Sequence, residues 1–259
     1  MDSEDILQDA LEFLGGSPVI DDSVIRYGPL ELTVAPKEGK ANTLLADHLF
    51  SPALFLAERI DQGLLDVKGK TVLELGAGCA LPSLLLTASA NPPSLVVVTD
   101  YPDEIILGNL KLNIKRNRGL VVPGCTVECC GYAWGSDPSE LRNLCSAQGC
   151  NTVDKSGFDI MILSDLLHFF ESHDVLVQSI QFMLSKSKSS RIYVGAGKYT
   201  REAVCENFLS KVADVGLMME EIVNDEREWR GTLNVSNLSP EDLQVRKANC
   251  RFWIGQWAS

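Results

Sequence analysis

The sequence predicts an α/β protein with a doubly wound, mostly parallel sheet of about seven strands. Short apolar, β-branched segments alternate with amphipathic helical segments between residues 71 and 215. Two of the short segments, 95–99 and 158–164, are almost entirely apolar, which is typical of parallel strands covered on both faces. Two later strand-like segments, 218–224 and 250–257, are predicted to add an antiparallel edge that includes the last strand.

The chain before residue 71 is expected to contain an N-terminal extension over residues 1–40, after which the main domain covers 41–259. Before residue 71 we expect a helix over 4–14, then a hairpin of strands 24–27 and 30–34 around Gly28-Pro29. A second helix is expected over 43–63, where Pro52 must lie in a first turn or mark a break. The hairpin is expected to lie outside the main fold.

The alternating part predicts one element for each segment. The expected strands are 71–75, 95–99, 126–134, 158–164 and 191–196, and the expected helices are 81–90, 103–117, 175–184 and 200–215. Two polar segments, 136–157 and 226–248, are expected to be surface insertions.

Composition excludes several classes of protein. The formal net charge of −12 argues against a nucleic-acid binder, which should carry a basic surface, and fits a basic protein partner. The eight cysteines and three histidines lack metal-binding spacing, so no metal site is predicted. No apolar segment is long enough to span a membrane, and the acidic N-terminus lacks signal-peptide features. We expect a protein of the cytoplasm, or alternatively the nucleus, with no membrane partner.

The segment 71–82, TVLELGAGCALP, is the strongest functional signal. It reads as a strand, a Gly-Ala-Gly turn and the start of a helix, which together form a cradle for a nucleotide-like ligand. Dinucleotide binding requires a third glycine near the helix start, and here Leu81 holds that position. S-adenosylmethionine has no pyrophosphate and does not need that glycine. The turn therefore favours S-adenosylmethionine, with a dinucleotide as the alternative.

Further candidates follow the other predicted strands, at the sheet edge where open α/β proteins bind ligands. Asp100 follows the second strand and can hold ribose hydroxyls; Asp103 is the better helix cap and so frees Asp100 for this role. Trp134 ends the third strand and can form a wall for adenine. Ser164 and Asp165 end the fourth strand.

These segments resemble the seven-strand S-adenosylmethionine-dependent methyltransferases, and within them family sixteen, which is dominated by protein lysine methyltransferases. The resemblance rests on VLELGAGCALPSL, VVVTDYPDEIILGNLKLNI, GYAWG, FDIMILSDLLHF and RKANCRFWIGQW, and it spans about residues 44–257. The most similar branch is a fungal one labelled nicotinamide N-methyltransferase-like, which includes an elongation-factor N-terminal and lysine methyltransferase of yeast.

The resemblance implies a role for each matching residue. S-adenosylmethionine would be the cofactor. Gly76, Ala77 and Gly78 would line its methionine part, and Glu74 would bond near its amino group or order the turn. Asp100 would hold the ribose with Tyr101 beside it, Trp134 would lie by the adenine, and Ser164 would complete the pocket.

Two positions depart from the family pattern. Phe50 replaces a tryptophan before the first strand, which keeps an aromatic wall but loses an indole donor. His168 replaces the tyrosine of a D-x-x-Y motif that begins here at Asp165. Because an amine must be neutral to accept a methyl group, Asp165 and His168 are the predicted catalytic residues that handle its proton.

Three functions remain open from the sequence. The first is N-methylation of a protein amine, a lysine side chain or an N-terminus, with a translation elongation factor as one implied substrate. The second is methylation of a small molecule of the nicotinamide type, and the third is a binding module that retains the fold without catalysis.

Overall fold

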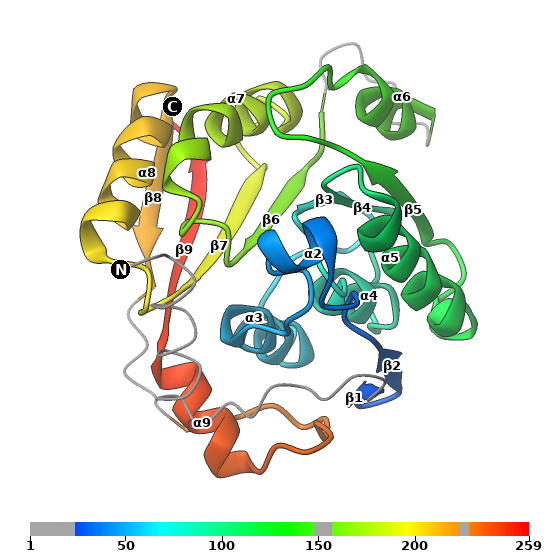
Figure 1. Ribbon diagram of the computed structural model, residues 1–259. Coiled ribbons are helices and arrows are strands. Elements are labelled where there is room, and N and C mark those ends of the chain that lie inside the picture. Colours follow the sequence, from blue (N-terminus) through cyan, green and yellow to red (C-terminus); the bar gives the residue numbers. More distant parts are fainter. Residues whose placement is uncertain (1–23, 148–156, 223–227, 259) are drawn as a thin grey trace.

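The computed structural model describes residues 24–147, 157–222 and 228–258. A seven-stranded sheet forms its centre, with the strand order β5-β4-β3-β6-β7-β9-β8 (Figure 1). The strands are β3 (Thr71–Leu75), β4 (Leu95–Asp100), β5 (Thr126–Gly131), β6 (Ile160–Ser164), β7 (Arg191–Gly197), β8 (Leu217–Glu221) and β9 (Cys250–Trp257). The first five pair in parallel, as the sequence predicts.

The antiparallel last strand is confirmed, and β8 and β9 together form the antiparallel edge that the sequence predicts. β9 runs antiparallel to both neighbours and lies between β7 and β8, so that β8 forms the edge. Trp253 of β9 is only 1% exposed, as suits an inner strand. A strand inserted in this position is buried from both sides, which explains its apolar character.

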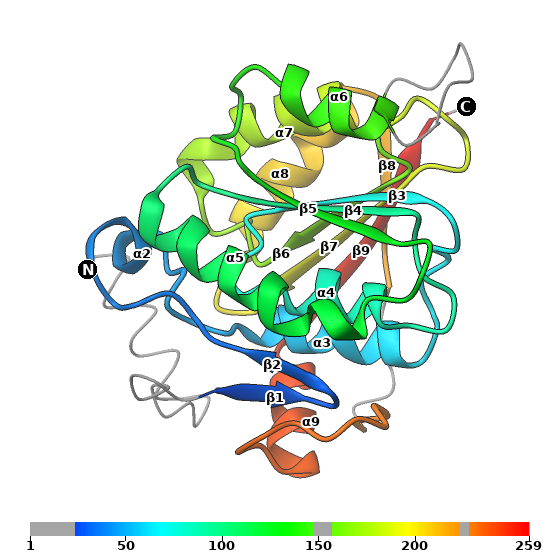
Figure 2. The same ribbon diagram turned by 90° about the vertical axis from the view of Figure 1, so that its right-hand side faces the viewer.

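Helices cover both faces of the sheet (Figure 2). One face carries α3 (Ser51–Asp61), α4 (Leu81–Thr87) and α5 (Glu104–Asn117), and the other carries α6 (Ser139–Ala147), α7 (His173–Met183) and α8 (Glu202–Asp214). Each face has its own apolar core, because successive strand residues point to opposite sides: Val72 and Leu73 of β3 belong to different cores. The doubly wound prediction is therefore confirmed.

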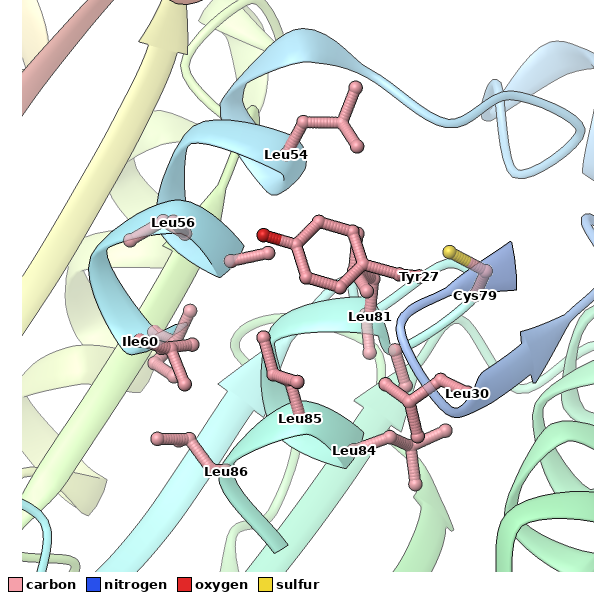
Figure 3. Packing of buried hydrophobic residues seen from close by; sticks show 14 of the residues in the cluster. Tyr27, Leu30, Leu54, Leu56, Ile60, Cys79, Leu81, Leu84, Leu85 and Leu86 are labelled. Carbon is pink, nitrogen blue, oxygen red and sulfur yellow. The ribbon is translucent and has the colours of Figure 1, made fainter. Parts of the chain in front are cut away.

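The predicted hairpin is present as β1 (Ile25–Tyr27) and β2 (Leu30–Leu32), in a sheet separate from the main one. Tyr27 lies between α3 and α4, among the leucines of both helices (Figure 3). Tyr27 also pairs with Val235 across an isolated antiparallel bridge. The hairpin is thus packed on the main core, so the expectation that it lies outside the main fold was wrong: its apolar side chains are buried against α3 and α4.

Three asparagines spaced four apart on α5 attach β2 to the main fold. Asn117 accepts a hydrogen bond from the Glu31 amide at 2.9 Å and donates to the Glu31 carbonyl at 2.8 Å. Asn113 bonds both backbone groups of Thr33 in the same way, at 2.9 and 2.8 Å. Asn109 donates to the Thr33 carbonyl at 2.8 Å. The side-chain amides therefore supply the partners that a neighbouring strand would otherwise give β2.

Asn113→Ala is expected to lower the free energy of unfolding by about 2 kcal/mol, and the melting temperature by about 5 °C. Asn113 is fully buried and also donates to the Cys79 carbonyl at 3.2 Å, so truncation leaves several buried polar groups without partners. Thermal unfolding measures the change. Lys111→Ala, at an exposed position of the same helix, is the control and should change little. Equal melting temperatures for the two variants would contradict this role.

Four predicted segments differ from the structure. The strand expected over 126–134 ends at Gly131 as β5, so Trp134 lies in the turn after the strand and does not end it. Residues 43–63 do not form one helix: α2 (Gly39–Thr43) and α3 are separated by residues 44–50, and Pro52 lies in the first turn of α3. The surface insertion 136–157 contains α6, whose Leu141 is buried under the sheet. The insertion 226–248 contains α9 (Pro240–Ala248).

Helix α9 is fastened to α3 by a buried ion pair. Lys247 Nζ lies 2.8 Å from Glu58 Oε1, and both side chains are almost completely buried. Lys247 also donates to the Glu228 carbonyl at 2.7 Å. A capping box formed by Ser239 and Asp242 starts the helix. These contacts explain why a polar segment is ordered here.

The helix expected over 4–14 lies outside the described residues. Among the helices of the described part, none has the length and apolarity required to cross a membrane.

Candidate active site

A cavity of about 280 Å³ lies at the carboxyl ends of the central strands. All the predicted cofactor and catalytic residues line it: Phe50, Glu74, Gly76, Ala77, Gly78, Asp100, Tyr101, Trp134, Ser164, Asp165 and His168. Most of them lie at the ends of β3, β4 and β6 or in the segments that follow β3, β4, β5 and β6. Phe50 comes from the segment just before α3. The structure therefore brings every one of them to a single site, whereas their individual roles stay predictions.

The glycine turn after β3 requires glycine at two positions. Gly76 has φ +57° and Gly78 has φ +55°, in the left-handed region. A Cβ on Gly76 would lie 2.6 Å from Leu166 Cδ2, so any side chain there would clash. A Cβ on Gly78 would meet nothing within 4 Å. The turn thus exposes its backbone to the cavity, as a closely approaching ligand needs.

Asp100 holds the turn and still faces the cavity. Its Oδ2 accepts a hydrogen bond from the Gly78 amide at 2.7 Å, and its Oδ1 accepts one from the Tyr101 amide at 2.7 Å. Asp103 caps α5 instead, accepting from the amides of Ile105 and Ile106. Each carboxylate oxygen of Asp100 retains a lone pair. Asp100 therefore has the capacity to accept hydrogen bonds from two ribose hydroxyls, and this role stays a prediction.

Glu74 and Ser164 present buried polar atoms without partners in the described part of the chain. The hydroxyl of Ser164 makes no hydrogen bond there, and neither carboxylate oxygen of Glu74 has a partner in good geometry, although the neighbouring Ser83 opposes the effect of burial on the pKa of Glu74. Glu74 is fully buried, and burial raises the pKa of its carboxyl to about 8. Unpaired buried polar groups are costly, so they indicate a ligand that supplies the missing partner. The positively charged methionine end of S-adenosylmethionine fits this donor and acceptor set.

Aromatic rings line the cavity on the side where the sequence predicts a wall for adenine. Trp134 is half-buried, and its ring packs edge-on against Phe169 with centroids 5.6 Å apart. Tyr101 is 40% exposed at the rim, with Lys40 Nζ 5.7 Å from its ring centroid. An apolar wall beside Asp100 suits a purine base attached to the ribose.

The opposite end of the cavity is lined by a second group of rings. His168 lies 4.0 Å from Phe169 and 6.5 Å from Phe50, measured between ring centroids. Neither ring nitrogen of His168 has a hydrogen-bond partner in the described part of the chain. Burial lowers the pKa of His168, against the opposing effect of the nearby Asp165 carboxylate. His168 is therefore neutral near pH 7.

Asp165 has close partners that the sequence did not predict. Its Oδ1 accepts a hydrogen bond from the Gly197 amide at 3.1 Å, and its Oδ2 accepts one from the Tyr199 hydroxyl. Its own backbone has φ +66°, a strained conformation for a residue other than glycine. Burial raises the pKa of Asp165. Because both oxygens are engaged, the carboxyl is directed at the end of β7 and holds Tyr199 in place.

Sequence reasoning missed three residues around this end of the cavity. Tyr199 follows β7, and its ring lies 6.4 Å from that of Phe50. Its only sequence signal was its place after a predicted strand. Asp47 and His48 lie in the segment that was expected to be helical, and His48 lines the cavity. Neither residue follows a predicted strand, so no sequence signal placed them at the site.

Comparisons with known proteins agree with this arrangement. A family model described as lysine methyltransferase matches residues 40–215. The protein N-terminal and lysine N-methyltransferase EFM7 of Gibberella zeae is 34% identical over 222 residues, which cover 83% of this chain and 80% of that protein. The protein of the same name from Schizosaccharomyces pombe is 30% identical over 171 residues, 66% of this chain and 62% of that one.

A solved structure supports the fold. The crystal structure of a SAM dependent methyltransferase from Aquifex aeolicus matches with a TM-score of 0.53 and 13% identity, over 86% of this chain and 100% of that chain. Together with the glycine turn, Asp100 and the unpaired Glu74, the family match identifies the cofactor as S-adenosylmethionine. The chain belongs to the lysine methyltransferase family and is an S-adenosylmethionine-dependent methyltransferase.

Proposed function

We propose that this enzyme methylates protein amines, either a lysine side chain or an N-terminal amine. Its relatives in Gibberella zeae and Schizosaccharomyces pombe carry names for both of these activities. The acidic net charge of −12 fits a basic protein partner. A translation elongation factor is the substrate that we propose within this class.

The observation that carries the proposal is the ring-lined end of the cavity. Phe50, His168 and Phe169 present aromatic faces there, and His168 is neutral. Aromatic faces attract ammonium groups, including methylated ones, whereas a charged histidine would repel them. This wall therefore suits an amine that gains positive charge as it is methylated.

The chain's own residues bind and align the reactants. When bound, S-adenosylmethionine supplies a methyl group on a positively charged sulfur, which a neutral amine can displace in line. The glycine turn, Asp100 and Glu74 hold the cofactor end, while Phe50 and His168 border the place for the amine. Such alignment lowers the barrier by several kcal/mol without a covalent enzyme intermediate.

Methyl transfer from labelled S-adenosylmethionine tests the proposal. The enzyme is offered a mixture of cellular proteins, the same mixture with its amines acetylated, and nicotinamide. We expect label on unmodified proteins, loss of that label after acetylation, and mass spectrometry that places the methyl groups on lysine or N-terminal nitrogen. Label found solely in a soluble pyridinium product would overturn the proposal in favour of small-molecule methylation.

A further inference from the structure

We propose that His48 is the general base that takes the proton from the substrate amine, and that Asp47 positions it. The inference rests on the proposed function, because it requires an amine as the methyl acceptor. It adds a catalytic residue outside the β-strand ends, in the segment 44–50 between α2 and α3.

The two side chains form a hydrogen-bonded pair. His48 Nδ1 lies 2.8 Å from Asp47 Oδ1. The Asp47 side chain is 3% exposed, whereas that of His48 is 19% exposed. The second carboxylate oxygen of Asp47 has no partner among the described residues. A buried carboxylate is thus aimed at an imidazole that reaches the cavity and solvent.

This contact determines which ring nitrogen is available. A carboxylate can only accept a hydrogen bond, so Nδ1 of His48 carries the hydrogen. In the neutral ring, Nε2 then keeps its lone pair. An Asp that fixes the tautomer of a His and stabilises its protonated form is the arrangement used in hydrolytic triads.

The pair lies at the acceptor end of the cavity. The His48 ring stacks on Phe50, with centroids 5.6 Å apart and an interplanar angle of 29°. Phe50 in turn contacts the rings of His168 and Tyr199. The adjoining Leu45 lines the cavity with φ +59°, a strained backbone of the kind that clusters at functional sites. His48 therefore borders the amine and not the ribose.

His48 is better suited to this step than the residues predicted from the sequence. Asp165 is 3% exposed and already accepts hydrogen bonds from the Gly197 amide and the Tyr199 hydroxyl, so it has no exposed portion through which a proton could leave. His168 has no hydrogen-bonded carboxylate, and its burial disfavours the protonated ring. His48 has a carboxylate partner and an exposed portion through which a proton can leave. His168 then contributes a neutral wall.

The ammonium group of the substrate transfers one proton to Nε2 of His48, which leaves a neutral amine with a free electron pair and an imidazolium. The Asp47 carboxylate stabilises the imidazolium through Nδ1–H. After the methyl group is transferred, Nε2 releases its proton to water at the exposed side of the ring, and the enzyme returns to its starting state.

The test compares His48→Ala, Asp47→Asn and the wild type, with Asp66→Asn as a matched control at an exposed aspartate that pairs with Lys70. Single-turnover methyl transfer to a protein amine and cofactor affinity by calorimetry are both measured. We expect His48→Ala to lower the transfer rate by about 100-fold or more, Asp47→Asn to lower it by about 10-fold, and Asp66→Asn to leave it unchanged. Cofactor affinity should stay within about twofold in all three.

Two further readouts separate a base from a structural residue. Added imidazole should restore part of the rate in His48→Ala but not in Asp47→Asn. Nitrogen NMR of labelled wild-type histidines should show His48 with its hydrogen on Nδ1, a measurement that needs no variant to fold. A wild-type rate in His48→Ala, failure of imidazole to restore any rate, or a hydrogen on Nε2 would overturn the proposal. If the wild type itself methylates no protein amine, it is the proposed function that fails.

Discussion

Asp100→Ala is expected to weaken binding of S-adenosylmethionine by about 100-fold or more, measured by calorimetric titration. A hydrogen bond to a charged group is worth about 1.5–3 kcal/mol, and Asp100 has capacity for two ribose hydroxyls. The substitution also removes the acceptors for the Gly78 and Tyr101 amides, which lie 2.7 Å from its two oxygens. The glycine turn would therefore lose the carboxylate that orients it.

Asp103→Ala is the control for Asp100→Ala. Asp103 lies three residues away, caps α5 and does not line the cavity. Its replacement should lower the free energy of unfolding by about 1 kcal/mol and leave cofactor affinity unchanged. Equal affinity losses in the two variants would show that Asp100 acts through stability and not through a ligand contact.

Glu74→Gln is expected to change how the stability of the ligand-free enzyme depends on pH. Burial raises the pKa of Glu74 to about 8, while the unfolded chain ionises it at its ordinary pKa. Between these two values the folded state holds a proton that the unfolded state has released, so the free energy of unfolding falls as pH rises. The fall approaches roughly 1.4 kcal/mol per pH unit for one group.

Denaturant unfolding at pH 5 and pH 8 measures this difference. The glutamine variant cannot ionise, so its stability relative to the wild type should rise by several kcal/mol between these pH values. Glu128→Gln, at an exposed position of β5, is the control and should follow the wild-type curve. Parallel curves for wild type and Glu74→Gln would contradict the raised pKa. Binding of the cationic cofactor should release a proton from the wild type near pH 7, and no such proton from Glu74→Gln.

The sequence was sufficient to predict the central sheet and to group the residues that line the cavity. The strand 71–75 is observed with its predicted bounds, since its apolar pattern and the following glycines agree. Asp103 is the cap of α5, as its position before an apolar helical segment suggested. Parallel strands bring their carboxyl ends to one edge, so residues that follow each strand could be grouped before any contact was known.

Elements determined by long-range contacts could not be predicted in this way. Helix α9 depends on a buried ion pair between Lys247 and Glu58, which are distant in sequence. The segment around His48 has a helix-like composition, yet it is not helical and connects α2 to α3. The asparagines of α5 look like a solvated polar face, although they bind the backbone of Glu31 in β2 and of Thr33 just after it. For α9 and the α5 asparagines the partner lies in another part of the chain.

A crystal structure of the enzyme with S-adenosylhomocysteine tests the central claim most directly. We predict that the ribose hydroxyls contact the Asp100 carboxylate, that the amino-acid end lies along Gly76–Gly78 near Glu74, and that the sulfur faces the rings of Phe50 and His168. Binding of the ligand with its ribose away from Asp100, or outside this cavity, would contradict the assignment of the site.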